Sequence, residues 1–170
     1  MKVLDIGCGS NKTPGAVGID ARPGPNVDIV WDLDQRPWPF SGDEFEAAVC
    51  RHVLEHLQDV VGTMAEIYRI CRPGSLVLIQ VPHFSNAYAF GDPTHRHFFS
   101  SRSMDRFIQD SSYHFRDQCR LTLVRKRLSF AGPGRYLIAP WANRMLNWFE
   151  RHLAFILPGQ DLTFLLRVDK

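Results

Sequence analysis

Two short apolar runs joined by a glycine-rich loop occupy the first twenty residues, and they restrict the fold more than any other feature. Residues 3–6 are mostly apolar and end at Gly7, which is typical of a buried strand. Gly7 and Gly9 allow a tight turn and a close approach of a ligand to the backbone. A second run over residues 16–19 ends at Asp20. This order predicts an open α/β sheet that binds a ligand where its strands end.

Further apolar runs predict the rest of the sheet. A helix over residues 57–71 is expected to stop at Pro73 and Gly74. The alternation of apolar and polar residues in the strand expected from residue 121 slips near Lys126, which predicts a β-bulge. We predict one domain over residues 1–170 with a doubly wound, mostly parallel, seven-stranded sheet and an antiparallel last strand pair. The other expected strands cover residues 27–31, 45–50, 76–81, 121–130 and 162–168, and a last helix covers residues 142–156.

The connection between the first two strands is short. Fifteen positions separate Asp5 from Asp20, whereas a parallel crossover alone normally takes roughly a dozen residues or more. Residues 11–15 contain Pro14 and cannot form a full crossover helix. The first crossover helix is therefore expected to be shortened or missing. That leaves an open site, which the 83–100 loop or a second subunit would complete.

Charge and cysteine content exclude several classes of function. The net charge of +2 gives no field that would draw nucleic acid, so no nucleic-acid partner is expected. No apolar run is long enough to span a bilayer, and no signal peptide is recognisable. We therefore expect a cytoplasmic protein. The four cysteines form no C-x-x-C pair and are typical of a reducing compartment: Cys8, Cys50, Cys71 and Cys119.

The D-x-G-C-G sequence of residues 5–9 is the most specific motif of the chain. With Asp20 and Asp32 at successive strand ends, it resembles the class I S-adenosylmethionine-dependent methyltransferases, which have a Rossmann-like sheet. Residues 45–57 and 70–79 are similar to the ubiquinone-biosynthesis-like branch (methyltransferase type 11). The third glycine of a dinucleotide-binding loop is absent, which counts against a dinucleotide. The resemblance implies S-adenosylmethionine as the cofactor and methyl transfer to a small-molecule acceptor.

The resemblance also implies roles for individual residues around the cofactor. Asp20 would hold the ribose, since a carboxylate can accept two hydrogen bonds from a diol. Asp32 and the Leu33 backbone would meet the adenine. The residues expected at the methionine part are Asp5, Gly7, Cys8, Gly9 and Arg51.

Histidines supply the expected catalytic groups. His83 directly follows a predicted strand, and His95 lies in the irregular segment 83–100. Either is expected to act as a base or to position the acceptor, because imidazole titrates near neutral pH. No residue is assigned to a metal. The residues expected to contact the acceptor are His52, His56, Arg96 and His97.

Two other functions fit parts of the sequence. His52, Glu55 and His56 spell H-x-x-E-H, a pattern of zinc peptidases. No third ligand stands out in the sequence, and the same segment fits the methyltransferase pattern, so a zinc hydrolase is the weaker interpretation. A non-catalytic module that binds S-adenosylmethionine or a partner fits the shortened first crossover.

The helix expected over residues 142–156 is strongly apolar. Its regular helical stripe favours packing on the sheet. A homodimer face or a contact with a membrane surface is the alternative. The side chains concerned are Trp141, Trp148, Phe149, Phe155 and Ile156.

Overall fold

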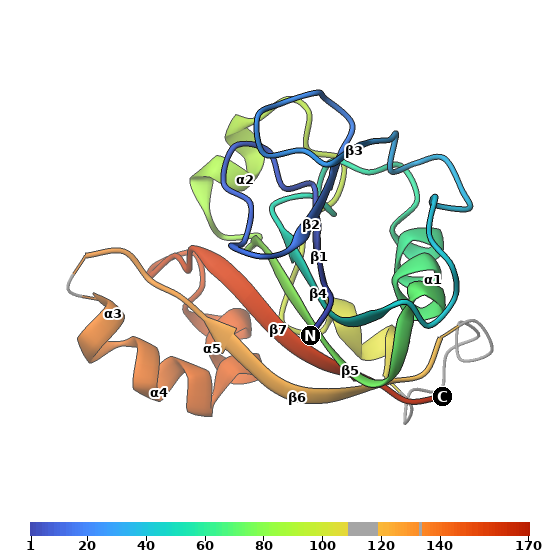
Figure 1. Ribbon diagram of the computed structural model, residues 1–170. Helices are drawn as coiled ribbons and strands as arrows, with labels where there is room; N and C mark the ends of the chain where they lie inside the picture. The colour runs from blue at the N-terminus through green and yellow to red at the C-terminus, as the bar shows by residue number, and fades with distance from the viewer. Residues whose placement is uncertain (109–118, 133) are drawn as a thin grey trace.

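A single seven-stranded sheet organises the computed structural model, which describes residues 1–108, 119–132 and 134–170 (Figure 1). The strands lie in the order β3-β2-β1-β4-β5-β7-β6. They are β1 (Val3–Ile6), β2 (Val17–Asp20), β3 (Ile29–Val30), β4 (Phe45–Arg51), β5 (Cys71–Pro82), β6 (Leu121–Leu128) and β7 (Asp161–Val168). The helices are α1 (Val60–Ile70), α2 (Ala87–Gly91), α3 (Gly134–Leu137), α4 (Ala139–Arg144) and α5 (Leu146–His152), with a 3-10 helix η1 (Ser103–Phe107).

The sheet is parallel except for one strand. β1 pairs with β2 and β4, β2 with β3, and β4 with β5, all in parallel. β7 lies antiparallel between β5 and β6. The predicted sheet of seven mostly parallel strands with an antiparallel last pair is therefore confirmed.

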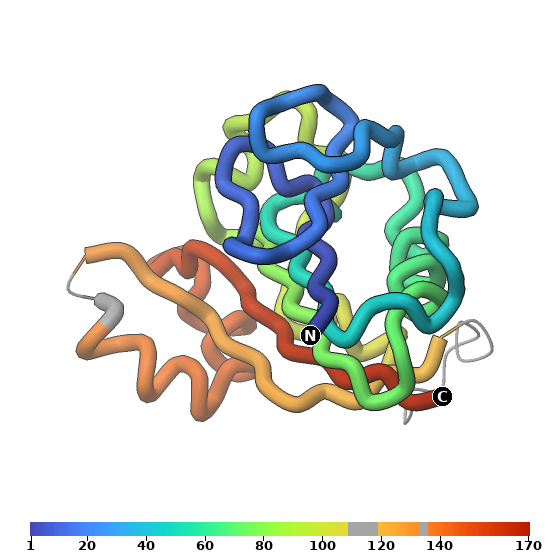
Figure 2. The backbone as a smooth tube through the Cα atoms, viewed as in Figure 1, coloured from blue at the N-terminus to red at the C-terminus, as the bar shows by residue number. Residues whose placement is uncertain are grey.

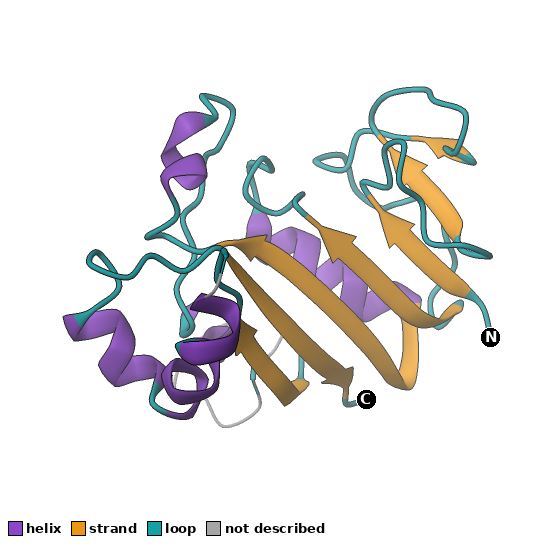
Figure 3. Ribbon diagram, turned by 90° about the vertical axis from the view of Figure 1, so that its left-hand side faces the viewer, coloured by secondary structure: helices purple, strands orange, loops and turns teal. Residues whose placement is uncertain are grey.

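The register of the central strands brings their carboxyl ends to one edge of the sheet, the upper edge in Figure 3. Ile6 of β1 pairs with Ile19 of β2 and with Cys50 of β4. The residues that end or follow these strands, Gly7 and Asp20 among them, consequently meet at that edge. Ligands of open α/β sheets bind there.

No helix lies between β1 and β2, as the short spacing predicted. The chain turns instead: the N–H of Gly7 donates to the carbonyl of Ile19 (2.8 Å), and that of Asn11 to the carbonyl of Cys8 (3.1 Å). Residues 21–28, between β2 and β3, contain no helix either. Figure 2 shows both segments as open loops in the blue part of the chain. The carboxyl edge of β1 and β2 is therefore covered by loops.

Helix α1 ends earlier than the sequence predicted. It ends at Ile70, and β5 begins at the next residue, so Pro73 and Gly74 lie within the assigned strand. Two backbone N–H groups just before β4 donate to the last carbonyl groups of the helix. That of Glu44 donates to the carbonyl of Ile70 (2.7 Å), and that of Asp43 donates to the carbonyl of Arg69 (3.1 Å). A residue before proline also avoids the helical conformation, so the helix cannot run up to position 73.

Helices lie on both faces of the sheet. Figure 3 shows α1 on one face and α4 with α5 on the other. Large apolar side chains fill the core between these layers, and the bulkiest are fully buried: Trp38, Phe45, Phe149 and Phe164. No helix within residues 1–108, 119–132 and 134–170 has the length and apolar character needed to cross a membrane.

The apolar helix expected over residues 142–156 is two short helices. Met145 separates them with φ of −123° and ψ of 41°, outside the helical region. Ala142, Leu146 and Phe149 are buried. The favoured interpretation, core packing, is therefore wrong for the other side chains of this face, because the break turns them to the surface: Trp141 (41% exposed), Trp148 (44%), Phe155 (81%) and Ile156 (72%).

Candidate functional site

The loop after β1 contains two glycines in the left-handed region. Gly7 has φ of 62° and Gly9 has φ of 49°. A Cβ atom at Gly7 would lie only 2.2 Å from Cγ2 of Val53, so this position needs glycine for space as well as for conformation. The loop therefore lies directly against the segment that follows β4.

Asp20 ends β2 and holds the glycine loop in place. Its Oδ2 accepts a hydrogen bond from the N–H of Gly9 (2.9 Å), and its Oδ1 accepts one from the N–H of Arg22 (2.9 Å). A carboxylate offers about four lone-pair positions. Each oxygen of Asp20 can therefore accept a further hydrogen bond from a ligand hydroxyl.

Asp5 and Arg51 support the loop from within. Asp5 is buried, and its Oδ2 accepts hydrogen bonds from the N–H of Thr13 (2.6 Å) and from Nη2 of Arg51 (2.9 Å). The same nitrogen of Arg51 donates to the carbonyl of Asn11 and to the hydroxyl of Thr13, both at 3.0 Å. A buried carboxylate needs such a cationic partner. Arg51 therefore fixes the loop and does not line a cofactor cavity, contrary to its expected place.

Cys8 also has a supporting place. Its side chain is buried, and Sγ lies 3.7 Å from the carbonyl oxygen of Asn26. Burial is the largest cause that raises the pKa of this thiol. Cys8 consequently packs the loop against the turn before β3 and is not a reactive group of the site.

Asp32 and Leu33 lie in the turn that follows β3. Oδ1 of Asp32 accepts a hydrogen bond from the N–H of Asp34 (3.0 Å), which forms a tight turn. The carbonyl of Leu33 accepts the indole N–H of Trp38 (3.1 Å), and Trp38 is buried. Oδ1 of Asp34 accepts the N–H of Gln58 (2.9 Å), which ties this turn to the segment before α1.

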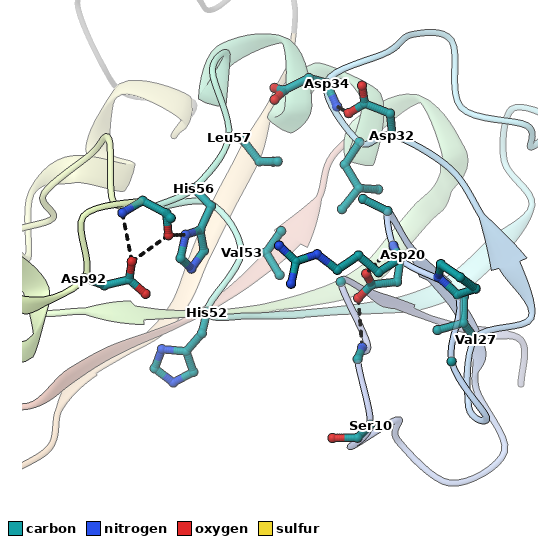
Figure 4. A pocket seen from close by; sticks show the side chains of 18 of the residues that line it. Ser10, Asp20, Val27, Asp32, Asp34, His52, Val53, His56, Leu57 and Asp92 are labelled. Atoms are coloured by element: carbon teal, nitrogen blue, oxygen red, sulfur yellow. Dashed lines mark hydrogen bonds between the residues drawn. The ribbon is translucent and has the colours of Figure 1, made fainter.

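A cavity of about 1250 Å³ lies over these strand ends (Figure 4). In Figure 4, Val53 lies between Asp20 on one side and His52 on the other. The cavity thus has an acidic wall from β2 and β3, an apolar floor and a histidine-rich wall. Of the predicted residues, it is lined by Gly7, Gly9, Asp20, Asp32, Leu33, His52, His56 and Arg96.

A second cavity of about 720 Å³ adjoins the first. The two share His52, His56, Asp92 and Pro93 in their walls. His95 lines the smaller cavity. The histidine-rich wall is therefore the boundary between two spaces, one for a cofactor-sized ligand and one for a smaller molecule.

His52 has an unusual backbone at this boundary. Its φ is 55°, a left-handed conformation that is uncommon for residues other than glycine, although histidine adopts it more often than most. Its Nδ1 lies 3.4 Å from Oε1 of Glu55. The carboxylate of Glu55 raises the pKa of His52 above its ordinary value, although burial acts in the opposite direction.

The segment 92–97 is attached to the end of β4 by its backbone. The N–H groups of Arg96 and His97 both donate to the carbonyl of Glu55, at 2.7 and 3.2 Å. Nδ1 of His56 pairs with the hydroxyl of Thr94 at 2.9 Å. The structure therefore brings together residues that lie about forty positions apart.

Two of the expected histidines lie outside both cavities. His83 is fully buried; its Nδ1 pairs with the hydroxyl of Ser85 (2.7 Å) and its Nε2 with Oε1 of Glu150 (3.1 Å). With both ring nitrogens engaged, His83 cannot reach an acceptor, so the prediction that it is a base is wrong. Nε2 of His97 is buried without a hydrogen-bond partner among the described residues, and the ring lines neither cavity.

Sequence reasoning missed Asp92 and Thr94. Both line the larger cavity, and the hydroxyl of Thr94 donates to Oδ1 of Asp92 (2.6 Å). The signal was the dense run of polar residues 92–97 within an otherwise irregular segment. Only the fold shows that this run lies against the end of β4.

These features define a class of protein. A sheet in this strand order, with β7 antiparallel and with the glycine loop and Asp20 lining one cavity, is the class I methyltransferase fold. A family model described as a methyltransferase domain matches residues 1–114. The chain therefore belongs to the methyltransferase domain family, and S-adenosylmethionine is the cofactor that this membership implies. The ubiquinone-biosynthesis-like branch stays a prediction.

Solved structures share the fold at low sequence identity. An S-adenosylmethionine-dependent methyltransferase from Archaeoglobus fulgidus has a TM-score of 0.63 at 18% identity, covering 98% of this chain and 85% of that one. One from Mesorhizobium loti has 0.62 at 13% identity, covering 98% and 90%. A methyltransferase from Haloferax volcanii, solved with the Trm112 activator, has 0.60 at 17% identity, covering 99% and 83%. A search of curated proteins finds no match.

Proposed function

We propose that this chain transfers the methyl group of S-adenosylmethionine to a small-molecule acceptor. One observation carries the proposal: Asp20 at the end of β2 lines the same cavity as Gly7 and Gly9. That cavity also contains Asp32 and Leu33, in the order along the sheet that a nucleoside requires. S-adenosylmethionine supplies a methyl group on a positively charged sulfur.

The residues of the chain would bind and orient the two reactants. Asp20 would accept hydrogen bonds from the ribose hydroxyls, and the apolar side chains of Val53 and Leu57 would pack on the adenosine. Holding the methyl carbon and the acceptor atom in line is the main contribution that such a site can make to the rate. The histidine-rich wall would face the methyl group.

The smaller cavity would hold the acceptor. Its volume of about 720 Å³ lies within the usual range for small-molecule sites. His52 and His56 border both cavities and would contact the acceptor, with His95 as the base or positioning group. Arg96 lines the larger cavity and would meet an acidic group of the acceptor.

A binding module without catalysis is the second candidate. The missing first crossover helix favours it, and so does the open cavity wall, because no helix lies between β2 and β3 either and the exposed residues 21–25 of that loop line the cavity. The Haloferax volcanii relative was solved with an activator protein, which supports a role for a partner here.

A homodimer through the exposed side chains of α4 and α5 stays a proposal, and sedimentation velocity would test it. A cytoplasmic location is likewise proposed, supported by four buried cysteines that are all free.

Calorimetric titration with S-adenosylmethionine and S-adenosylhomocysteine tests the cofactor site. Asp20→Ala is expected to weaken binding of both by ~1–3 kcal/mol, the scale for hydrogen bonds to a charged group. Asp105→Ala is the matched control, since Asp105 is partly exposed and lines neither cavity. Folded wild-type protein that binds neither compound at millimolar concentration would contradict the proposal.

Formation of S-adenosylhomocysteine in the presence of a panel of small hydroxyl and amine acceptors separates the two candidate functions. The enzyme produces it in an acceptor-dependent manner. A module without catalysis binds the cofactor with wild-type affinity and produces none with any acceptor of the panel.

A further inference from the structure

Three potential metal ligands converge on the wall between the two cavities. Glu55 and His56 come from the segment after β4, and His95 comes from the segment after α2. Each offers one ligand atom, and the three atoms lie within 4.8 Å of one another. The sequence pattern H-x-x-E-H pairs His52 with His56, but the fold groups His56 with His95. It thereby supplies the third ligand that the sequence did not reveal.

The carboxylate of Glu55 lacks a hydrogen-bond partner. Its side chain is only 1% exposed, and neither oxygen has a partner among the described residues. Nδ1 of His52 lies 3.4 Å from Oε1 of Glu55, which is close enough for an ion pair if His52 is protonated but lacks hydrogen-bond geometry. A buried carboxylate without hydrogen bonds is costly, so native proteins pair such groups with a cation or a metal.

Within the described part of the chain, the two histidines use Nδ1 for a hydrogen bond and leave Nε2 without one; Nε2 of His95 lies 4.0 Å from Oδ2 of Asp92. A carbonyl oxygen can only accept, so Nδ1 of His95 carries the proton in its 2.8 Å hydrogen bond to the carbonyl of Ala89. The hydroxyl of Thr94 donates to Asp92, so Nδ1 of His56 must donate to that hydroxyl. Both rings therefore keep Nε2 as a lone pair. Metal-binding histidines are oriented in this way, with the other nitrogen donating to a carbonyl or to a polar chain that ends in a carboxylate.

The backbone fixes the distance between the two segments. Arg96 and His97 both donate their N–H groups to the carbonyl of Glu55. These bonds hold the segment that contains His95 against the segment that contains Glu55 and His56. Ligands of a tetrahedral zinc ion are about 3.4 Å apart, whereas one ligand atom from each of the three residues lies within 4.8 Å of the others, so metal binding requires the side chains to adjust. The imidazole rings of His56 and His95 already lie edge to face, with centroids 4.7 Å apart.

We propose that Glu55, His56 and His95 bind a divalent first-row transition metal, with zinc as the first candidate. Two imidazoles and one carboxylate form the ligand set of catalytic zinc sites, which keep a fourth position open. All three residues line the smaller cavity, so the open position would face it. If the cavity holds the acceptor, which rests on the proposed function, that position takes an acceptor oxygen or nitrogen atom.

The direct test is metal binding to the full chain, purified without a histidine tag and treated with a chelator. Calorimetry with zinc chloride and the visible spectrum of the cobalt(II) form are measured, together with the metal content of untreated protein. We expect one metal ion per chain and a cobalt spectrum typical of four- or five-coordinate nitrogen and oxygen ligands. Folded protein that binds neither zinc nor cobalt overturns the inference.

Variants assign the site. Glu55→Gln and His95→Gln are expected to weaken zinc binding at least tenfold. Thr94→Val, which removes the hydroxyl that links Nδ1 of His56 to Asp92, is expected to weaken it by roughly 10–100-fold. His152→Gln is the control, because His152 is exposed and stacks on Trp148 outside both cavities. Wild-type affinity in Glu55→Gln and His95→Gln overturns the inference.

Two further measurements keep the test independent of folding and of the proposed function. Circular dichroism shows whether each variant is folded. If Glu55→Gln unfolds, the metal-binding result of His95→Gln decides whether the site exists, because His95 lies in a loop. S-adenosylhomocysteine binding is titrated in the same samples. Metal binding without nucleoside binding contradicts the proposed function and supports the metal site. Nucleoside binding without metal binding supports the proposed function and overturns the metal site.

Discussion

Individual side chains fix the glycine loop, which here replaces a crossover helix. Arg51 is the clearest case, because one of its nitrogens donates to Asp5, to the carbonyl of Asn11 and to Thr13. The sequence motif suggested a contact with the cofactor. The actual partners lie 38 to 46 positions away in the chain, so no local pattern could reveal them.

Replacing Arg51 is predicted to destabilise the fold. Arg51→Ala leaves the buried carboxylate of Asp5 with only the N–H of Thr13, and we expect a loss of ~1–3 kcal/mol in the free energy of unfolding. Urea denaturation measures it. Arg72→Ala is the control, since Arg72 pairs with the exposed Glu46 and such pairs contribute at most about 1 kcal/mol. Equal losses in the two variants would contradict this role of Arg51.

At the scale of elements, the sequence predicted what depends on local periodicity. The strands and the missing first helix follow from short apolar runs and from Pro14, and both are confirmed. The bulge in β6 lies between Leu123 and Arg125, close to the predicted slip at Lys126. The break at Met145 was not predicted, because the apolar stripe continues through it and only packing against the sheet reveals which side chains are buried.

A hydrogen bond between His83 and Glu150 links the segment after β5 to helix α5. Burial alone would raise the pKa of Glu150, but its hydrogen bonds to His83 and Ser101 outweigh burial and lower that pKa. A carboxyl whose pKa is lower in the folded state stabilises the fold above its unfolded pKa. That stabilisation is lost as the pH falls through the folded pKa. The contact with Glu150 that keeps His83 away from an acceptor therefore stabilises the fold.

Glu150→Gln is predicted to lower stability in a pH-dependent manner. At pH 7 we expect a loss of ~1–3 kcal/mol, since Glu150 is almost fully buried and accepts three hydrogen bonds. The loss should shrink as the pH falls from about 4.5, the pKa of the unfolded carboxyl, towards the lower pKa of the folded one. Urea denaturation of wild type and variant at pH 7 and pH 4 measures the difference. A loss that stays constant with pH would refute the assignment.

At the scale of the whole molecule, ligand binding and folding are coupled. The site joins β1, β2, β3 and β4 through loops alone, so a nucleoside bound there would stabilise the parallel half of the sheet. The match to the family covers this half, residues 1–114.

S-adenosylhomocysteine is predicted to raise the melting temperature. At a concentration one hundred times its dissociation constant, a ligand adds about 2.7 kcal/mol to stability. For a chain of 170 residues this corresponds to about 5–10 °C. Differential scanning fluorimetry measures the shift, with adenine alone as the comparison ligand. An unchanged melting temperature at millimolar S-adenosylhomocysteine would show that the folded chain does not bind it.

The loops between β1 and β3 also affect how long a ligand stays bound. No helix lies in either of these two connections, and the exposed residues 21–25, which follow β2, form the rim through which a bound nucleoside would leave. The spent cofactor can therefore diffuse out without waiting for an element to open. Its residence time would be short, and the ratio of fresh to spent cofactor around the protein would decide how often the site is ready for another reaction.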